Sequence, residues 1–142
     1  MRHRNFSEHP EIRDYGGAPL ILNINHAANM NENFRTVLWT GDDMQLTLMS
    51  IPTGGEIGVE MHTDVDQFIR VESGRAKVYI GNSEGNLKEA AFVESGYAIL
   101  IPAGTWHNIV NGGNRPLKLY SLYAPPKHPQ GTVIRKKEDE EH

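Results

Sequence analysis

Residues 55–74 of the chain read GEIGVEMHTDVDQFIRVESG, and residues 96–111 read GYAILIPAGTWHNIVN. Both stretches are short β-type runs bounded by glycine-containing turns, and the apolar side chains of the central hundred residues recur with a period of two. This pattern predicts antiparallel β-structure. The polar side chains inside these strands further indicate that the two stretches share one pocket.

Four polar side chains in the two stretches are candidate metal ligands: Glu60, His62, Gln67 and His107. Side chains alternate across a strand, so Glu60 and His62 point to one face, and a turn before Gln67 lets it face inward from the next strand. Two imidazoles, one carboxylate and one amide oxygen suit Zn, Fe(II), Mn, Ni or Co rather than thiolate-preferring metals. We therefore predict one bound divalent ion. The alternative is that the histidines only satisfy hydrogen bonds of the core.

The two stretches resemble the two halves of the cupin signature, G-x5-H-x-H-x4-E-x6-G and G-x5-P-x-G-x2-H-x3-N. The second half matches at every fixed position: Gly96, Pro102, Gly104, His107 and Asn111. The first half keeps His62 and Gly74. It has Glu60 in place of the first histidine and Gln67 in place of the glutamate. The resemblance covers about residues 35–125 and implies an all-β fold, a double-stranded β-helix or jelly-roll barrel with the metal near its middle.

The first half is also similar to the cupin part of type II mannose-6-phosphate isomerases, whose motif runs Q-x-H-x4-E. Glu60 and Gln67 stand in that pattern with the two residue types exchanged, and Val65 stands where those enzymes carry an arginine. The resemblance implies a metal-dependent sugar or sugar-phosphate isomerase or epimerase. Asp64 and Asp66, in the turn between His62 and Gln67, are the candidate catalytic residues, as a general base or as acceptors behind the ligands, and the alternative is that they only form the turn.

Two other classes of function remain open for such a site. Two histidines and a carboxylate on Fe(II) also suit an oxygen-dependent dioxygenase. A cupin can equally hold a small molecule without turning it over, because a fold does not determine a function.

Length and composition limit the number of domains and the classes of partner. The 142 residues suit a single domain, and the formal net charge of -4 argues against a nucleic-acid or membrane-surface partner. The chain contains no cysteine, which excludes disulfides and thiolate ligands. No apolar run is long enough to span a bilayer, so we expect a cytoplasmic protein with a small-molecule ligand.

Three regions are expected along the chain. Residues 1–34 form an N-terminal arm with the first strand or strands, residues 35–126 form the barrel, and residues 127–142 form a C-terminal segment with a frayed charged tail. A weak helix is predicted at 27–33. The predicted strands cover residues 20–24, 35–40, 45–51, 56–62, 67–72, 76–80, 89–93, 97–101, 107–110 and 117–123.

Strand alternation also predicts the surroundings of the site. If Glu60 and His62 face the pocket, then Ile57, Val59 and Met61 face outward and need cover, which favours a homodimer. By the same rule, three apolar side chains wall the pocket beside the ligands: Ile69, Val71 and Ile109.

One further histidine lies outside the two stretches. His128 follows two prolines and is interpreted as a surface histidine, with capping of the barrel mouth as the alternative.

Overall fold

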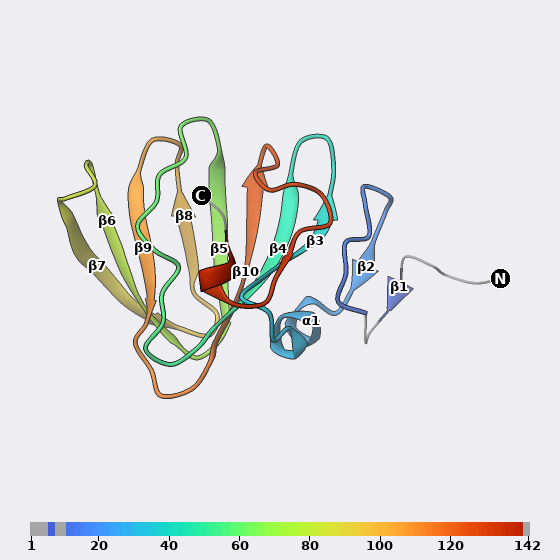
Figure 1. The fold of residues 1–142 in the computed structure, drawn as a ribbon, viewed down its shortest axis with the longest axis horizontal. Helices are drawn as coiled ribbons and strands as arrows, with labels where there is room; N and C mark the ends of the chain where they lie inside the picture. Colours follow the sequence, from blue (N-terminus) through green and yellow to red (C-terminus); the bar gives the residue numbers. More distant parts are fainter. Residues whose placement is uncertain (1–5, 8–10, 141–142) are drawn as a thin grey trace.

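The computed structural model describes residues 6–7 and 11–140 and is mostly β-structure (Figure 1). The predicted all-β jelly-roll fold is confirmed. Among the described residues, no helix is long and apolar enough to cross a membrane. The elements follow in the order β1 (Phe6–Ser7), β2 (Ile21–Leu22), α1 (Ile24–Met30), β3 (Arg35–Thr40), β4 (Gln45–Ile51), β5 (Asp66–Ser73), β6 (Arg75–Gly81), β7 (Leu87–Glu94), β8 (Ala98–Ile101), β9 (Trp106–Asn111), β10 (Leu117–Ala124), β11 (Val133–Ile134) and the 3₁₀ helix η1 (Lys137–Asp139).

Two antiparallel sheets enclose the main core. The larger sheet has the strand order β11-β3-β4-β10-β5-β8, and the smaller has the order β7-β6-β9. Side chains from both sheets meet between them, including Met49, Ile69, Val78 and Ile109. Figure 1 shows the smaller sheet at one end of the molecule and the N-terminal strands β1 and β2 at the other.

A second core covers the outer face of the larger sheet. Helix α1 buries Ala27 and Ala28 against Leu38 and Leu48, because these small residues let the helix approach the strands closely. The helix begins earlier than the predicted 27–33, since the Asn23 side chain accepts a hydrogen bond from the His26 amide and caps its N-terminus.

The predicted strand at residues 56–62 is wrong. This segment makes only two isolated bridges, one of them between Glu60 and His107, and Gly58 has a φ of +109° that interrupts the regular alternation. As a result Ile57 does not face outward but lies in the main core, 4% exposed, while Val59 is exposed. The outward apolar stripe on which the homodimer rested is therefore absent, and the homodimer stays a prediction.

The described part of the C-terminal segment lies against the barrel. Strand β11 pairs with β3, and the Glu140 carboxylate forms an ion pair with Arg35 at 2.7 Å. No pattern in the sequence identifies this pair, because the two residues are 105 positions apart. The division into residues 1–34, 35–126 and 127–142 remains a prediction.

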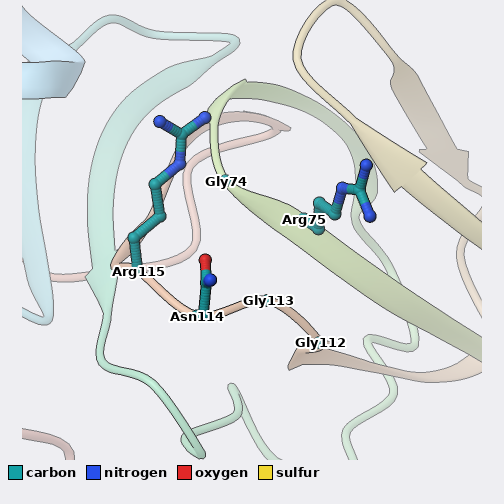
Figure 2. A pocket seen from close by; sticks show the side chains of 6 residues that line it. All are labelled: Gly74, Arg75, Gly112, Gly113, Asn114 and Arg115. Atoms are coloured by element: carbon teal, nitrogen blue, oxygen red, sulfur yellow. The ribbon is translucent and has the colours of Figure 1, made fainter.

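Gly74 connects β5 and β6 at the end of β5 farthest from Gln67. Figure 2 shows it beside the loop of residues 112–115, with Arg75 and Arg115 extending on either side. Its φ is +91°, and a Cβ atom there would lie 2.9 Å from the carbonyl oxygen of Pro116. Both the backbone conformation and the close approach therefore require glycine.

We predict that Gly74→Ala lowers the free energy of unfolding by about 3 kcal/mol, from the left-handed conformation and from the contact with the Pro116 backbone. Gly96→Ala is the matched control, since Gly96 has a φ of +92° but no atom within 4 Å of its added Cβ. That variant should lose only about 1 kcal/mol. Urea unfolding measures both values, and equal losses would show that the close approach at Gly74 is unimportant.

Candidate metal centre

A pair of backbone hydrogen bonds places Glu60 directly opposite His107. The Glu60 amide donates to the His107 carbonyl at 3.0 Å, and the His107 amide donates to the Glu60 carbonyl at 2.9 Å. The Asn108 side chain holds the preceding residues, because its Oδ1 accepts from the Gly58 amide and its Nδ2 donates to Glu56. The irregular segment is thus fixed along β9 without belonging to a sheet.

Three predicted ligands converge. The Oε1 atom of Glu60 lies 3.4 Å from Nε2 of His107 and 3.5 Å from Nε2 of His62. One ligand atom from each of the three residues lies within 4.8 Å of the other two. His62 and His107 are buried, and Glu60 is partly exposed. The structure therefore brings together Glu60, His62 and His107, as the spacing predicted.

The contact made by Nδ1 identifies the tautomer of His107. Nδ1 lies 2.9 Å from the carbonyl oxygen of Thr105, so it carries the proton and donates to that oxygen. Nε2 of the same ring faces the Glu60 carboxylate. Among the described residues, neither Nε2 of His107 nor Nε2 of His62 has a hydrogen-bond partner.

The electrostatics of this arrangement fit a cation. Burial raises the pKa of Glu60, but His107 and His62 outweigh that effect and hold the pKa well below its usual range, so the carboxylate is ionised. Buried polar atoms without partners are costly. A divalent ion that prefers nitrogen and oxygen ligands would give both imidazole nitrogens a partner and would balance the charge of the carboxylate.

Gln67, the fourth predicted ligand, lies near the start of β5. It is 3% exposed, and its Nε2 donates to the hydroxyl of Ser121 at 3.2 Å. Its Oε1 is buried and accepts no hydrogen bond. Gln67 pairs across the strands with Tyr123, whose ring contacts His62. The carbonyl oxygen thus remains available, and its role as a ligand stays a prediction.

The structure does not bring Asp64 and Asp66 to this cluster. Both side chains are exposed. Asp66 instead accepts a hydrogen bond from the Ala103 amide at 2.9 Å, next to Gly104, whose amide donates to the carbonyl of His62. Asp66 therefore helps to hold the loop that supports the site, and neither acid lines the adjoining pocket.

The adjoining pocket has a volume of about 720 Å³, a size typical of small-molecule sites. Most of the residues that line it are polar or charged. The expected apolar walls, Ile69, Val71 and Ile109, lie in the main core instead. The pocket is lined by Arg35, Glu60, Met61, His62, Lys127, His128, Pro129, Thr132, Ile134, Asp139 and Glu140.

Tyr123 links the cluster to the rest of the pocket. Its ring packs edge-on against His62 and His128, with centroid distances of 5.9 and 5.1 Å. Its hydroxyl accepts a hydrogen bond from Nη1 of Arg35 at 3.0 Å. Inward positions on β10 alternate with outward ones, so strand parity alone could have placed Tyr123 on the inner face of the barrel.

His128 lines the pocket rather than the outer surface, contrary to the preferred interpretation of the sequence. The side chain of Gln45 fixes it, because Oε1 accepts from the His128 amide and Nε2 donates to the His128 carbonyl. Burial, together with the charge of Arg35, lowers the pKa of His128 to about 3. The ring is therefore neutral at physiological pH, and its buried Nε2 is without a hydrogen-bond partner.

Known proteins resemble this chain over most of its length. The sequence profile of the cupin domain matches residues 47–123. The uncharacterized protein YrkC of Bacillus subtilis (strain 168) is 53% identical over 128 residues, which are 90% of this chain and 69% of YrkC. The uncharacterized protein L612 of Acanthamoeba polyphaga mimivirus is 39% identical over 114 residues, which are 80% of this chain and 69% of L612.

Solved structures agree with these matches. The crystal structure of BH2720 from Bacillus halodurans has a TM-score of 0.88 at 54% identity and covers 90% of this chain and 97% of that protein. KdgF from a Halomonas species has a TM-score of 0.56 at 20% identity, with 66% of this chain and 80% of KdgF covered. The last likeness shows the fold alone.

We predict that changing His62 and His107 together to Ala removes most bound divalent metal, because each histidine contributes a strong nitrogen donor. Metal content after dialysis against buffered zinc, measured by mass spectrometry, tests this. His26→Ala is the control, since His26 lies on α1, outside the cluster. Full metal occupancy in the double variant would refute the ligand assignment.

Proposed function

Because this chain belongs to the cupin domain family, we propose that it binds a divalent metal ion through Glu60, His62 and His107 and acts on a small polar metabolite in the adjoining pocket. The observation that carries the proposal is the geometry of the cluster. A carboxylate and two unpartnered imidazole nitrogens face one another beside a pocket of about 720 Å³. Gln67 is proposed as a fourth ligand.

A bound ion would supply Lewis acidity toward oxygen atoms of the metabolite, and three protein ligands leave positions open for them. The chain's own residues provide the rest of the binding site. Neutral His128 can donate or accept one hydrogen bond with a ligand. Its low pKa makes it a weak base, so it binds and orients the ligand rather than moving a proton.

Among the reaction classes, the site favours oxidation of the metabolite by molecular oxygen. Two histidines and one carboxylate suit Fe(II) with open positions, and this chemistry requires no separate acid–base pair. Isomerisation does require a side chain that moves a proton, and the two candidates, Asp64 and Asp66, are exposed outside the pocket.

Isomerisation of a sugar or sugar phosphate is the second candidate. The carboxylate of Asp139 lines the same pocket and could move a proton in place of the two acids. Binding without turnover is the remaining possibility. A homodimeric state and a cytoplasmic location remain separate predictions.

The function is tested by identifying the metal that co-purifies and then measuring oxygen uptake with a panel of hydroxy acids, keto acids and sugars. We expect iron together with substrate-dependent oxygen consumption. Interconversion of an aldose and a ketose without oxygen uptake would favour the isomerase. Purified protein that neither retains nor binds any divalent metal would refute the proposed metal centre.

A paired substitution tests how the charge of the site controls metal affinity. Glu60→Gln keeps the shape but leaves a neutral ligand set, so we expect metal affinity to fall by about tenfold or more while folding is retained. Gln67→Glu adds a negative charge and should tighten metal binding. Calorimetric titration of both variants and the parent measures the effect. Unchanged affinity in both would show that charge at these two positions does not govern binding.

A further inference from the structure

Arg35 is a buried charged residue that lines the pocket but takes no part in the proposed metal centre. It lies on β3, and its side chain is 2% exposed. Burial lowers the pKa of Arg35, but Tyr123 and Glu140 outweigh that effect and raise it, so the guanidinium stays charged. A buried charge needs compensation, and Glu140 provides it across 2.7 Å.

Within the described residues, only some of the N–H donors of the Arg35 guanidinium have hydrogen-bond partners. Nε donates to Glu140, and Nη1 donates to the hydroxyl of Tyr123. A guanidinium has five N–H donors, which leaves three without a partner in the described part of the chain. Tyr123 holds the group in a fixed orientation, and a planar donor fork is suited to two oxygens of a carboxylate or phosphate.

The compensating carboxylate comes from a lightly held segment. Glu140 directly follows η1, and none of the residues of η1 is buried. The Glu140 amide donates to the carbonyl of Lys137, a bond within the same short turn. Segments with few buried contacts open at low cost in free energy. Glu140 can therefore leave Arg35 without disturbing the barrel.

We propose that Arg35 is the anion-binding residue of the pocket, and that Glu140 occupies the position taken by a carboxylate or phosphate group of the ligand. The ligand class is thus a small anionic metabolite whose charged group reaches Arg35 and whose other oxygen atoms reach the cluster of Glu60, His62 and His107. This identification of the ligand rests on the proposed function, because it assigns the second end of the ligand to the metal.

The charges of the pocket agree with an anionic ligand. With an ion at the cluster and Glu140 displaced, Arg35 and the ion carry positive charge, and Lys127 adds another at the lining. Glu60 and Asp139 offset only part of this charge. An anion entering the pocket would therefore be attracted to both ends.

A second group of arginines does not offer a comparable site. Figure 2 shows the side chains of Arg75 and Arg115 diverging on either side of Gly74. Arg75 is 60% exposed and lies 3.7 Å from Glu94. These exposed side chains do not converge on one point, in contrast to the oriented guanidinium of Arg35.

The test compares two variants that remove the same charge from the same segment. Glu140→Gln removes the competing carboxylate, and Glu138→Gln, which is exposed and outside this pocket, is the matched control. Inorganic phosphate and acetate are titrated into EDTA-treated protein at constant ionic strength, with calorimetry as the readout. We expect Glu140→Gln to bind one of the two anions about tenfold more tightly than the parent, because Glu140 then no longer blocks Arg35. Glu138→Gln should bind like the parent.

The two anions distinguish the source of the charge, since tighter binding of phosphate indicates a phosphorylated ligand and tighter binding of acetate indicates a carboxylate. Arg35→Lys in the Glu140→Gln background should abolish the gain, with circular dichroism to check the fold. Equal anion affinity in Glu140→Gln and Glu138→Gln, or no binding to either, would overturn the proposal. Zinc titration of the same samples tests the metal centre separately from the anion site. If the protein binds the anion but not zinc, only the proposed metal centre is refuted.

Discussion

Two reciprocal backbone hydrogen bonds between Glu60 and His107 are the constraint on which the site depends. They connect a segment outside the sheets to β9, and they place a carboxylate opposite an imidazole whose other nitrogen is held by Thr105. Because the backbone bridge pairs the two residues, their side chains leave the chain on the same face of the paired segments. The fold thus holds an ionised carboxylate beside two imidazole nitrogens, a donor set that suits a divalent cation.

Side chains of the barrel wall connect this cluster to the rest of the pocket. Tyr123 contacts His62 with its ring and Arg35 with its hydroxyl, so the metal cluster and the charged end of the pocket share one side chain. Gln45 holds the backbone of His128 on the other side of that ring. The result is a rigid polar surface on the inner face of β3, β4 and β10. One wall of the pocket, around Glu140, is held more loosely than the rest.

Regular alternation was sufficient to predict most strands, and the spacing of the polar residues in the two motifs predicted three ligands that converge. The alternation failed at residues 56–62, where the positive φ of Gly58 interrupts the strand. Glu60 and His62 nevertheless reach the cluster, because β9 and the loop at Gly104 hold their backbones separately. Asp64 and Asp66 are close to His62 in the sequence, but their side chains are exposed, because proximity in sequence does not determine the direction of a side chain.

The pairing of Arg35 with Glu140 could not be predicted, because it depends on where a distant segment returns to the barrel. Arg35 begins a strand that also carries Val37, Leu38 and Trp39. Charged residues are rarely buried without a partner, so a partner for Arg35 can be expected only once its burial is known.

Strand β10 carries two independent sets of side chains. Ser121 and Tyr123 face the barrel interior and contact Gln67 and Arg35, while Tyr120 and Leu122 pack against the N-terminal cover on the opposite face. Substitutions at neighbouring positions of this strand therefore act on different properties. Changes of the inner set would alter the surroundings of the site, whereas changes of the outer set would alter the attachment of the helix and leave the site intact, so the two properties can be engineered separately on one strand.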